Sequence, residues 1–284
     1  MATRLFVGLL LAFLPVMVRA EYVYTSFEEA LHEKSRVRSI RITYKFLDSL
    51  PDIFDHFPNL EEVNFSHNHL QKLPPSFFRC RKLRIVKLQR NKFTSIPREF
   101  GRLRYLQHLS LSYNNIEELP DSIGNLVNLE EFGLRNNRLE RLPETMGNLK
   151  RLRKIALSSN YLKELPASFP QLKELEFLDL SDNYLARLPN DFGKLRSLKF
   201  LYINRNRLEF IPESIGNCKF LQELDVSFSG VMQLPNSLSD IQKLDYVYVD
   251  SRTILFYPDP RNKYRQHIIT VDAGAMNYRP SQAF

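Results

Sequence analysis

The residues of this 284-residue sequence best suited to metal chemistry are a histidine pair and two cysteines. His67 and His69 flank Asn68 in an HNH triplet, and the cysteines are Cys80 and Cys218. A structural zinc site needs four such ligands. The cysteines cannot complete one, because both fall at a position of a repeat, described below, where other repeats have a leucine that points into the core. We therefore expect no metal ligands and no cofactor.

Residue patterns that carry catalysis are also missing. The sequence has no glycine-rich phosphate loop, no nucleophile elbow and no paired-carboxylate motif. His108 has no evident nucleophile or base as its partner. Asp179 and Asp225 are predicted to lie roughly 10 Å apart, two strand spacings, on an open surface. We expect no catalytic residues and predict that the chain is not an enzyme.

A repeat of 23 residues organises the chain, and Leu106 to Asn128 (LQHLSLSYNNIEELPDSIGNLVN) is one complete unit. Self-similarity at a fixed period of this size is typical of solenoids, in which stacked units share one continuous core. Ten units follow one another without a change of spacing. Their first residues are Val37, Leu60, Leu83, Leu106, Leu129, Leu152, Leu175, Leu198, Leu221 and Leu244.

Each unit predicts a strand, a descending segment and a short turn. Positions 4 and 6 are apolar and position 5 is mostly polar, as in Leu109, Ser110 and Leu111, which is strand alternation. A proline follows position 14 in every unit, where it suits extended or irregular backbone. An apolar residue at position 18, commonly followed by glycine, indicates short helical or 3₁₀ turns on the convex side. The pattern predicts an α/β solenoid, a horseshoe with a parallel sheet on its concave face.

Position 9 is asparagine in seven consecutive units, at Asn68, Asn91, Asn114, Asn137, Asn160, Asn183 and Asn206. A buried amide needs hydrogen-bond partners, and we expect each asparagine to bond backbone groups of its own turn and the next. The column is interrupted in the end units, at Lys45, Ser229 and Arg252. The two cysteines share the buried position 21 but are six repeats apart, roughly 29 Å by strand spacing, so no disulfide is expected.

The ends of the chain depart from the repeat. A basic residue, an apolar run and a small residue at Ala20 predict a secretory signal peptide. The run is shorter than the roughly 20 residues that span a membrane, and no later segment is long enough. The predicted divisions are a signal peptide at 1–20, a helical N-terminal cap at 21–36, the repeat array at 37–258 with a partial tenth unit, and a C-terminal cap and tail at 259–284 containing a strand near 267–271.

The units resemble the leucine-rich repeat family, in particular the 23-residue class with an LPxxIGNL motif found in Ras-group and scribble-type proteins and in many bacterial proteins. The motif is carried by LPDSIGNLVNL (119–129), LPETMGNLKRL (142–152) and IPESIGNCKFL (211–221), and the resemblance covers residues 37–258. It implies a recognition scaffold that binds proteins, peptides or glycans on its concave surface. The chain lacks the cysteine-rich caps usual in animal extracellular members, which favours a bacterial secreted or surface protein.

Positions 3 and 5 of each strand are predicted to point out of the concave face, and in the C-terminal half they combine aromatic and acidic residues. Exposed aromatic residues on a rigid sheet are typical interface anchors. The alternative is that these rings pack on one another or beneath the C-terminal tail. The predicted partner-binding residues are Phe177, Asp179, Phe200, Tyr202, Asp225, Tyr246 and Tyr248. A second candidate runs from Lys72 to Arg104, with eleven basic residues and one acid, but such runs more often mark a solvated face.

The predicted function is non-catalytic recognition of a protein or glycan by a secreted module, either extracellular or periplasmic. No nucleic-acid partner is expected. The formal net charge of +8 indicates only non-specific attraction to anionic partners. The alternative is an intracellular signalling scaffold of the Ras-group type, which requires that residues 1–20 are not a leader. The sequence leaves the oligomeric state and the identity of the ligand open.

Overall fold

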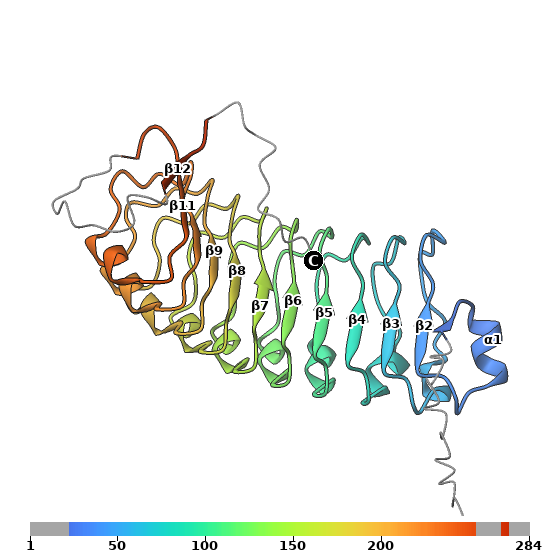
Figure 1. The fold of residues 1–284 in the computed structure, drawn as a ribbon. Helices are drawn as coiled ribbons and strands as arrows, with labels where there is room; N and C mark the ends of the chain where they lie inside the picture. Colours follow the sequence, from blue (N-terminus) through green and yellow to red (C-terminus); the bar gives the residue numbers. More distant parts are fainter. Residues whose placement is uncertain (1–22, 254–267, 273–284) are drawn as a thin grey trace, which may run out of the picture.

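A computed structural model describes residues 23–253 and 268–272. Twelve strands form one parallel sheet, in which each strand lies beside the next in sequence order (Figure 1). The predicted signal peptide lies outside the described residues. The strands are β1 Val23–Tyr24, β2 Ser39–Arg41, β3 Glu62–Asn64, β4 Ile85–Lys87, β5 His108–Ser110, β6 Glu131–Gly133, β7 Lys154–Ala156, β8 Phe177–Asp179, β9 Phe200–Tyr202, β10 Glu223–Asp225, β11 Tyr246–Val249 and β12 Ile268–Thr270.

The register of the sheet stacks equivalent positions of consecutive repeats. Glu62 of β3 pairs with Ile85 of β4, which pairs with His108 of β5, and each step is one repeat. The same register holds from β2 to β11. Each repeat position therefore forms a column across the sheet, and the predicted horseshoe with a parallel sheet is confirmed.

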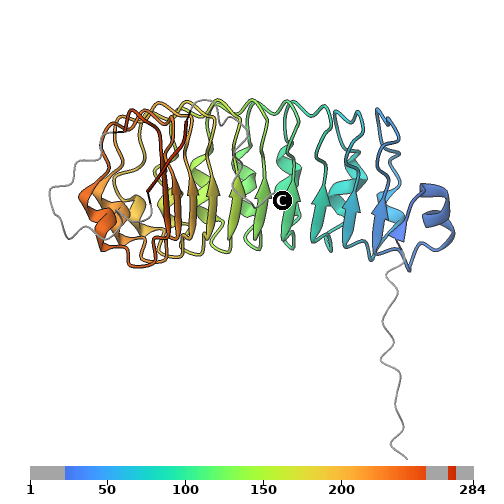
Figure 2. The same cartoon turned by 45° about the horizontal axis from the view of Figure 1, so that its top comes forward.

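The opposite side of the array consists of short 3₁₀ helices, as predicted (Figures 1 and 2). Most of them follow directly on the repeat proline, whose extended backbone, with φ of −70° at Pro97 and −72° at Pro120, leads the chain into the turn. In the described part of the chain they are η1 Phe54–His56, η2 Pro75–Arg79, η3 Arg98–Arg102, η4 Asp121–Asn125, η5 Glu144–Asn148, η6 Phe169–Gln171, η7 Phe192–Lys194, η8 Glu213–Asn217 and η9 Asn236–Asp240.

Glycine at position 19 allows the 3₁₀ helices to stack closely. A Cβ atom placed on Gly124 would lie 2.5 Å from the backbone carbonyl oxygen of Thr145 in the next repeat. No side chain fits at such a distance without a backbone shift. The glycine that follows the apolar residue is therefore a packing requirement of the convex side.

One continuous apolar core runs the length of the array. In the central unit Leu106, Leu111, Ile116 and Ile123 are fully buried. The two cysteines are buried in this core without a disulfide, as predicted. Burial raises the pKa of both thiols to about 12, so they remain protonated at neutral pH.

The asparagine column forms a hydrogen-bonded ladder beneath the ends of the strands. The side-chain oxygen of Asn114 accepts from the backbone N–H of Phe93 at 3.1 Å, and its amide donates to the carbonyl oxygens of Leu88 at 3.1 Å and Leu111 at 2.9 Å. The other six asparagines repeat this pattern. The partners belong to the asparagine's own turn and to the preceding one, so the prediction that each would bond the next turn is wrong in direction.

The residue before each ladder asparagine has a left-handed backbone conformation. The φ angle is 59° at Tyr113 and 54° at Asn136, and the same position has a positive φ in nine consecutive repeats, from Tyr44 to Phe228. This conformation is costly for residues other than glycine. Because it also occurs before Lys45 and Ser229, the conformation belongs to the turn that follows the strand, and in seven repeats this turn places the asparagine amide in the core.

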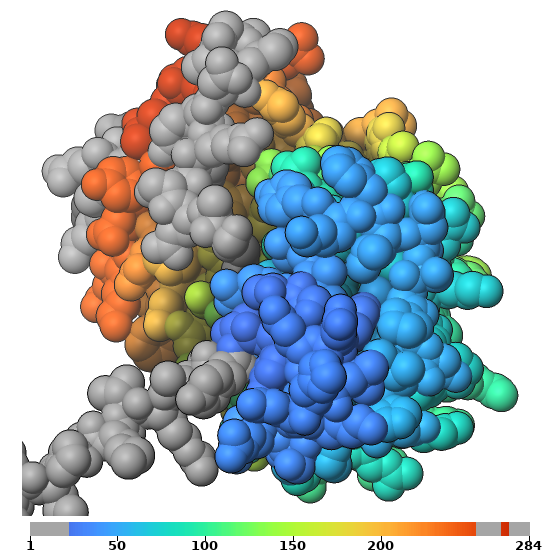
Figure 3. All heavy atoms as spheres, turned by 90° about the vertical axis from the view of Figure 1, so that its right-hand side faces the viewer, coloured from blue at the N-terminus to red at the C-terminus, as the bar shows by residue number. Residues whose placement is uncertain are grey.

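Both ends of the described array are covered. At the N-terminal end, helix α1 (Phe27–His32) is capped by Ser26, whose hydroxyl accepts from the N–H of Glu29 at 3.2 Å. Phe27 packs against Phe54 with ring centres 5.9 Å apart. Figure 3 views this end, where the cap is dark blue. Strand β1, which the sequence did not predict, pairs with β2. At the other end, the predicted strand near 267–271 is present as β12 and pairs with β11.

Replacing Asn114 by alanine tests the ladder. The change leaves the N–H of Phe93 without its acceptor and removes one of the two asparagine donors from each carbonyl oxygen of Leu88 and Leu111. We therefore expect a loss of roughly 1–3 kcal/mol in the free energy of unfolding. Urea denaturation measures it. The matched control is Asn115→Ala, because the neighbouring Asn115 is only half-buried and should lose far less. Equal stability of the two variants would contradict the ladder.

Candidate functional site: the concave face of strands β8 to β11

The seven predicted partner-binding residues lie together on four adjacent strands. The register places them in two rows across β8 to β11. Glu223, which the sequence columns also place on this aromatic and acidic surface, occupies the same column as Phe200 and Tyr246. The rows are Phe177, Phe200, Glu223, Tyr246 and Asp179, Tyr202, Asp225, Tyr248.

The expectation that the aromatic residues are exposed is wrong for most of them. Phe177, Tyr202 and Tyr248 are 5–6% exposed and Phe200 is half-buried, while Tyr246 is 49% exposed. Strands of a sheet lie about 4.8 Å apart, so rings on this face pack against one another. Phe177 and Tyr202 have ring centres 5.6 Å apart, and Tyr246 and Tyr248 lie 6.3 Å apart. The lateral packing considered for Phe177 and Phe200 is present, with ring centres 6.4 Å apart. The tail considered as a cover for Tyr246 and Tyr248 lies outside the described residues except at 268–272.

Asp225 is a buried carboxylate in the middle of this surface. It is 3% exposed, and its Oδ1 accepts from the backbone N–H of Ser227 at 2.9 Å and from the Ser227 hydroxyl at 2.7 Å. Burial raises the pKa of Asp225 to about 6; the hydrogen bonds from Ser227 oppose this, and the charges of Glu223 and Asp179 add to it. The pKa of this carboxylate therefore lies much closer to neutral pH than that of an ordinary aspartate.

Glu223 and Tyr202 interact across β9 and β10. Burial raises the pKa of Glu223, while the Tyr202 hydroxyl stabilises its charged form. Burial also raises the pKa of Tyr202, and the nearby carboxylate of Glu223 raises it further. The phenol therefore stays protonated and available as a hydrogen-bond donor to an anionic neighbour.

The acids of this surface lack the cationic neighbours that acids have elsewhere on the sheet. On β3, Glu62 forms an ion pair with Lys87 at 3.7 Å, and on β6 Glu131 contacts His108 and Lys154, both at 3.1 Å. No ion pair in the described ranges, 23–253 and 268–272, involves Asp179, Glu223 or Asp225. Among the described residues, the acids on the concave face of β8 to β10 therefore have no ion-pair partner.

The HNH triplet does not form a metal site. Asn68 belongs to the ladder, and the ring of His67 stacks on Tyr44 with centres 4.0 Å apart. Partial burial and the charge of Arg90 lower the pKa of His67. Within the residues that the structure describes, no three His, Cys, Asp or Glu side chains are grouped so as to hold a metal ion.

The basic run from Lys72 to Arg104 is distributed around the coil. Lys87 lies on the sheet, Arg79 in η2 forms an ion pair with Asp55, and Arg90, in the loop after β4, lies over the ring of Tyr113. These side chains face different directions, and several have partners. The run does not converge on one site.

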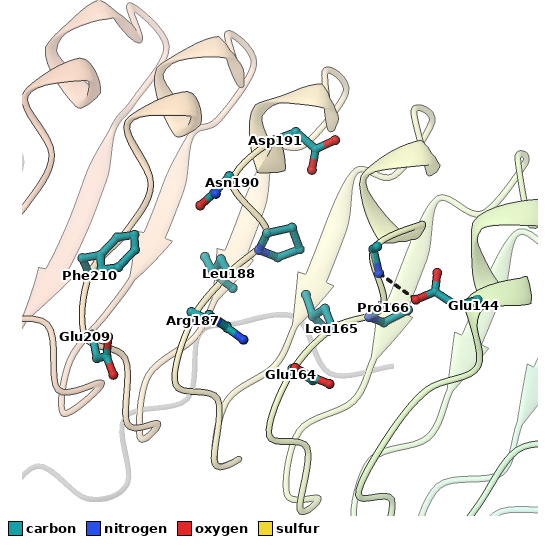
Figure 4. A pocket seen from close by; sticks show the side chains of 12 residues that line it. Glu144, Glu164, Leu165, Pro166, Arg187, Leu188, Asn190, Asp191, Glu209 and Phe210 are labelled. Carbon is teal, nitrogen blue, oxygen red and sulfur yellow. Dashed lines mark hydrogen bonds between the residues drawn. The ribbon is translucent and has the colours of Figure 1, made fainter.

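An open hollow of about 700 Å³ lies on the descending side of the repeats (Figure 4). Its rim carries Glu164, Arg187 and Phe210. The carboxylate of Glu144 is already occupied, because it accepts from the backbone N–H groups of Ala167 and Ser168, both at 3.0 Å, and thereby caps the next turn. This hollow offers no grouping of nucleophile and base, and we regard the concave surface as the better candidate.

Fold and site together define a solenoid with a parallel sheet on one side and 3₁₀ turns on the other. A family model described as "Leucine-rich repeat region" matches residues 36–159 and 121–205, and one described as "Leucine Rich Repeat" matches residues 197–218. The chain belongs to the leucine-rich repeat family. No curated protein matches it.

Solved structures share the fold. A leucine-rich repeat protein of Leptospira interrogans is 30% identical with a TM-score of 0.78, over 83% of this chain and 60% of that one. The ectodomain of the Arabidopsis thaliana membrane receptor kinase GASSHO1/SCHENGEN3, in complex with CASPARIAN STRIP INTEGRITY FACTOR 2, is 26% identical with a TM-score of 0.70, over 87% and 29%. The functional domain of InlJ from Listeria monocytogenes, 20% identical with a TM-score of 0.65 over 78% and 46%, shows the fold alone.

The present chain therefore spans less than two thirds of the length of each of these structures. Among the described residues, no helix has the length and apolar character needed to cross a bilayer.

Replacing Asp225 by asparagine tests the electrostatics of the site. Because the pKa of Asp225 is raised from 3.8 to about 6 on folding, the folded chain binds this proton more tightly than the unfolded chain. The stabilisation by the proton is complete below about pH 4 and is lost as the pH rises through about 6. Near pH 7.5, Asp225→Asn should therefore raise the free energy of unfolding by on the order of 1–3 kcal/mol.

This gain in the free energy of unfolding should vanish near pH 4. Denaturation curves recorded near pH 7.5 and near pH 4 measure it. Asp245→Asn is the control, because Asp245 is an exposed acid in the following repeat and should change stability little at either pH. A gain at Asp225 that does not depend on pH would show that burial of its charge is not the cause.

Proposed function

We propose that this chain is a non-catalytic recognition module that binds a protein partner through the concave face of β8 to β11. The observation that carries the proposal is the combination, on one rigid surface, of partly exposed aromatic residues and carboxylates that have no ion-pair partner among the described residues. Phe200 and Tyr246 offer apolar contact area, and Glu223 and Asp179, both half-buried, offer charge beside them. Buried aromatic anchors next to defined polar groups are typical of protein interfaces.

The family and the related structures support this proposal. The Arabidopsis ectodomain, which is 26% identical to this chain, was solved in complex with CASPARIAN STRIP INTEGRITY FACTOR 2. The parallel sheet gives the present chain a comparable rigid surface. A preformed sheet loses little conformational freedom on binding, which favours affinity.

A protein is better supported than a glycan as the ligand. Sugar recognition by aromatic residues relies on exposed ring faces that lie flat against the sugar. Of the five aromatic residues in the two rows, Tyr246 is exposed, Phe200 is half-buried and the other three are buried. A protein side chain can instead insert between such residues and reach the acids beside them.

We also propose that residues 1–20 direct the chain out of the cytoplasm. N-terminal sequencing of the protein from its native source tests this. A mature chain that starts at Glu21, recovered outside the cytoplasm, is the expected result. An intact Met1 in the cytosol would favour the alternative, an intracellular signalling scaffold.

Selection of binders tests the concave surface. We expect a displayed library of random peptides of about 12 residues to yield sequences that bind the purified chain. The double variant Phe200→Ala/Tyr246→Ala should bind them at least about tenfold more weakly, because it removes two accessible anchors.

Tyr105→Ala is the matched control, since Tyr105 is 64% exposed but lies outside the two rows. It should bind with unchanged affinity. Peptides that bind the double variant and the unaltered chain equally well, or a library that yields no binder, would contradict the proposal.

A further inference from the structure

We propose that the loops at the carboxyl ends of the strands form a second binding site, which takes an acidic polysaccharide. The inference goes beyond the proposed function, because it concerns another surface and another class of ligand. We call this surface the loop edge. It consists of positions 8 and 10 of nine consecutive repeats, from Tyr44 and Phe46 in the first repeat to Phe228 and Gly230 in the ninth.

The residues of the loop edge lie in the turns that follow the strands, and these turns stack along one edge of the array (Figure 2). Position 8 is the residue with the left-handed backbone, as at Arg205. Side chains from both positions reach one surface, because Asp182 and Arg205 of position 8 and Tyr184 of position 10 line the same open hollow of about 490 Å³. Each position recurs once per repeat, about 4.8 Å from its neighbour.

The loop edge is basic and exposed. Its eighteen residues include one acid, Asp182, and five cations. The cations, all of them exposed, are Arg90, Lys92, Arg138, Arg205 and Arg207. Within residues 23–253 and 268–272, Arg138 has an ion-pair partner, Glu117 at 3.9 Å, and the other four cations have none. Four cations of this edge are therefore available to an anionic ligand.

Tyrosine rings hold two of these guanidinium groups in place. The guanidinium carbon of Arg90 lies 4.3 Å from the ring centre of Tyr113, and that of Arg207 lies 4.5 Å from the ring centre of Tyr184. This contact is made by the face of the guanidinium, so the N–H groups in its plane can still bind an anion. Because the rings order these cations in advance, less conformational freedom is lost when an anion binds.

The cations form a line along the array. Arg90 and Lys92 belong to the third repeat, Arg138 to the fifth, and Arg205 and Arg207 to the eighth. Five strand spacings, roughly 24 Å, separate the two ends of this line. A single phosphate or carboxylate cannot reach both ends, whereas a chain with anionic groups on successive units can contact all of the cations. The spacing therefore predicts a linear polyanion.

The uncharged and acidic groups of the hollow favour a polysaccharide among the linear polyanions. Asn136, Ser159 and Asp182 line the hollow together with Arg205. Amide, hydroxyl and carboxylate groups form hydrogen bonds with hydroxyl groups, which are abundant on sugars. Asp182 would repel the phosphates of a nucleic acid and the carboxylates of an acidic peptide, unless hydroxyl groups of the ligand lie beside it.

The aromatic residues of the edge also disfavour a single-stranded nucleic acid. Such ligands bind by stacking their bases on open aromatic faces. The ring of Tyr113 is covered by Arg90, and Tyr184 contacts both Arg207 and the ring of Tyr161, whose centre lies 5.9 Å away. These rings serve to order the cations and are not open platforms for bases.

Heparin, a sulfated polysaccharide, and alginate, a carboxylated one, are the probes, with affinities measured by calorimetry near physiological salt. We expect heparin or alginate to bind, and Arg205→Gln/Arg207→Gln to weaken this binding by at least about tenfold through loss of charge-assisted hydrogen bonds. Arg102→Gln/Arg104→Gln is the matched control. It removes the same charge from two exposed residues at the convex side and should leave affinity unchanged. Thermal unfolding confirms that both variants are folded.

The length of the polysaccharide tests the linear arrangement. Affinity should rise with fragment length until a fragment spans the roughly 24 Å between Arg90 and Arg207, and Arg90→Gln should weaken the binding of such long fragments. Disaccharides that bind as tightly as the long fragments would contradict a line of cations.

Other outcomes would overturn the inference as a whole. Equal losses in the two double variants would show non-specific attraction to the net charge of the chain. Polyglutamate or a single-stranded oligonucleotide that binds as tightly as the polysaccharide would assign the edge to another class of ligand, and absence of binding to both polysaccharides would leave it without one.

The concave face provides the comparison that separates this inference from the proposed function. Phe200→Ala/Tyr246→Ala should bind the polysaccharide normally, and Arg205→Gln/Arg207→Gln should bind the selected peptides normally. Polysaccharide binding that is lost in the Phe200→Ala/Tyr246→Ala variant would place this ligand on the concave face and overturn the inference.

Discussion

The interaction on which the rest of the structure depends is the asparagine ladder. Each amide connects the backbone of its own repeat to that of the preceding repeat, as Asn137 does through Ile116, Leu111 and Leu134. A buried amide must keep its hydrogen-bond partners, so the ladder favours repeats of equal length. The strand pairing shows this length, because paired residues are 23 positions apart in sequence. The left-handed residue before each asparagine is the local strain that this arrangement requires.

A fixed spacing turns sequence columns into surfaces. On β3 to β7 the two acids, Glu62 and Glu131, have lysine or histidine side chains beside them on neighbouring strands. On β8 to β11 the columns hold rings and acids, and the rings pack sideways because the strands are so close together. Lateral packing gives the surface rigidity, but it also buries Asp225 without a cation.

The fold could be predicted from the sequence almost completely, because each position of the unit recurs ten times and its environment is the same each time. The sheet, the 3₁₀ turns, the helix after Ser26 and the final strand all follow from local patterns. The direction of the ladder could not be predicted, since own-turn and neighbouring-turn partners look alike in sequence. Strand β1 has two residues, Val23 and Tyr24, too few for any periodic pattern.

The candidate site could be predicted only in part. The columns identified which residues share a face, but not how much of Phe177 or Tyr202 their neighbours cover, because that depends on side-chain packing between strands. Whether Asp225 has an ion-pair partner likewise depends on distances to side chains in other repeats, and among the described residues its hydrogen-bond donors belong to Ser227.

Hydrogen exchange of the complex with a selected peptide tests the central claim most directly, that recognition occurs on the concave face of β8 to β11. Backbone amides from Phe177 to Tyr248 on these strands should exchange more slowly in the complex than in the free chain, while those of β3 to β5 should not change. Slower exchange confined to the 3₁₀ turns or to residues 72–104 would contradict the account, because it would place the partner on another surface.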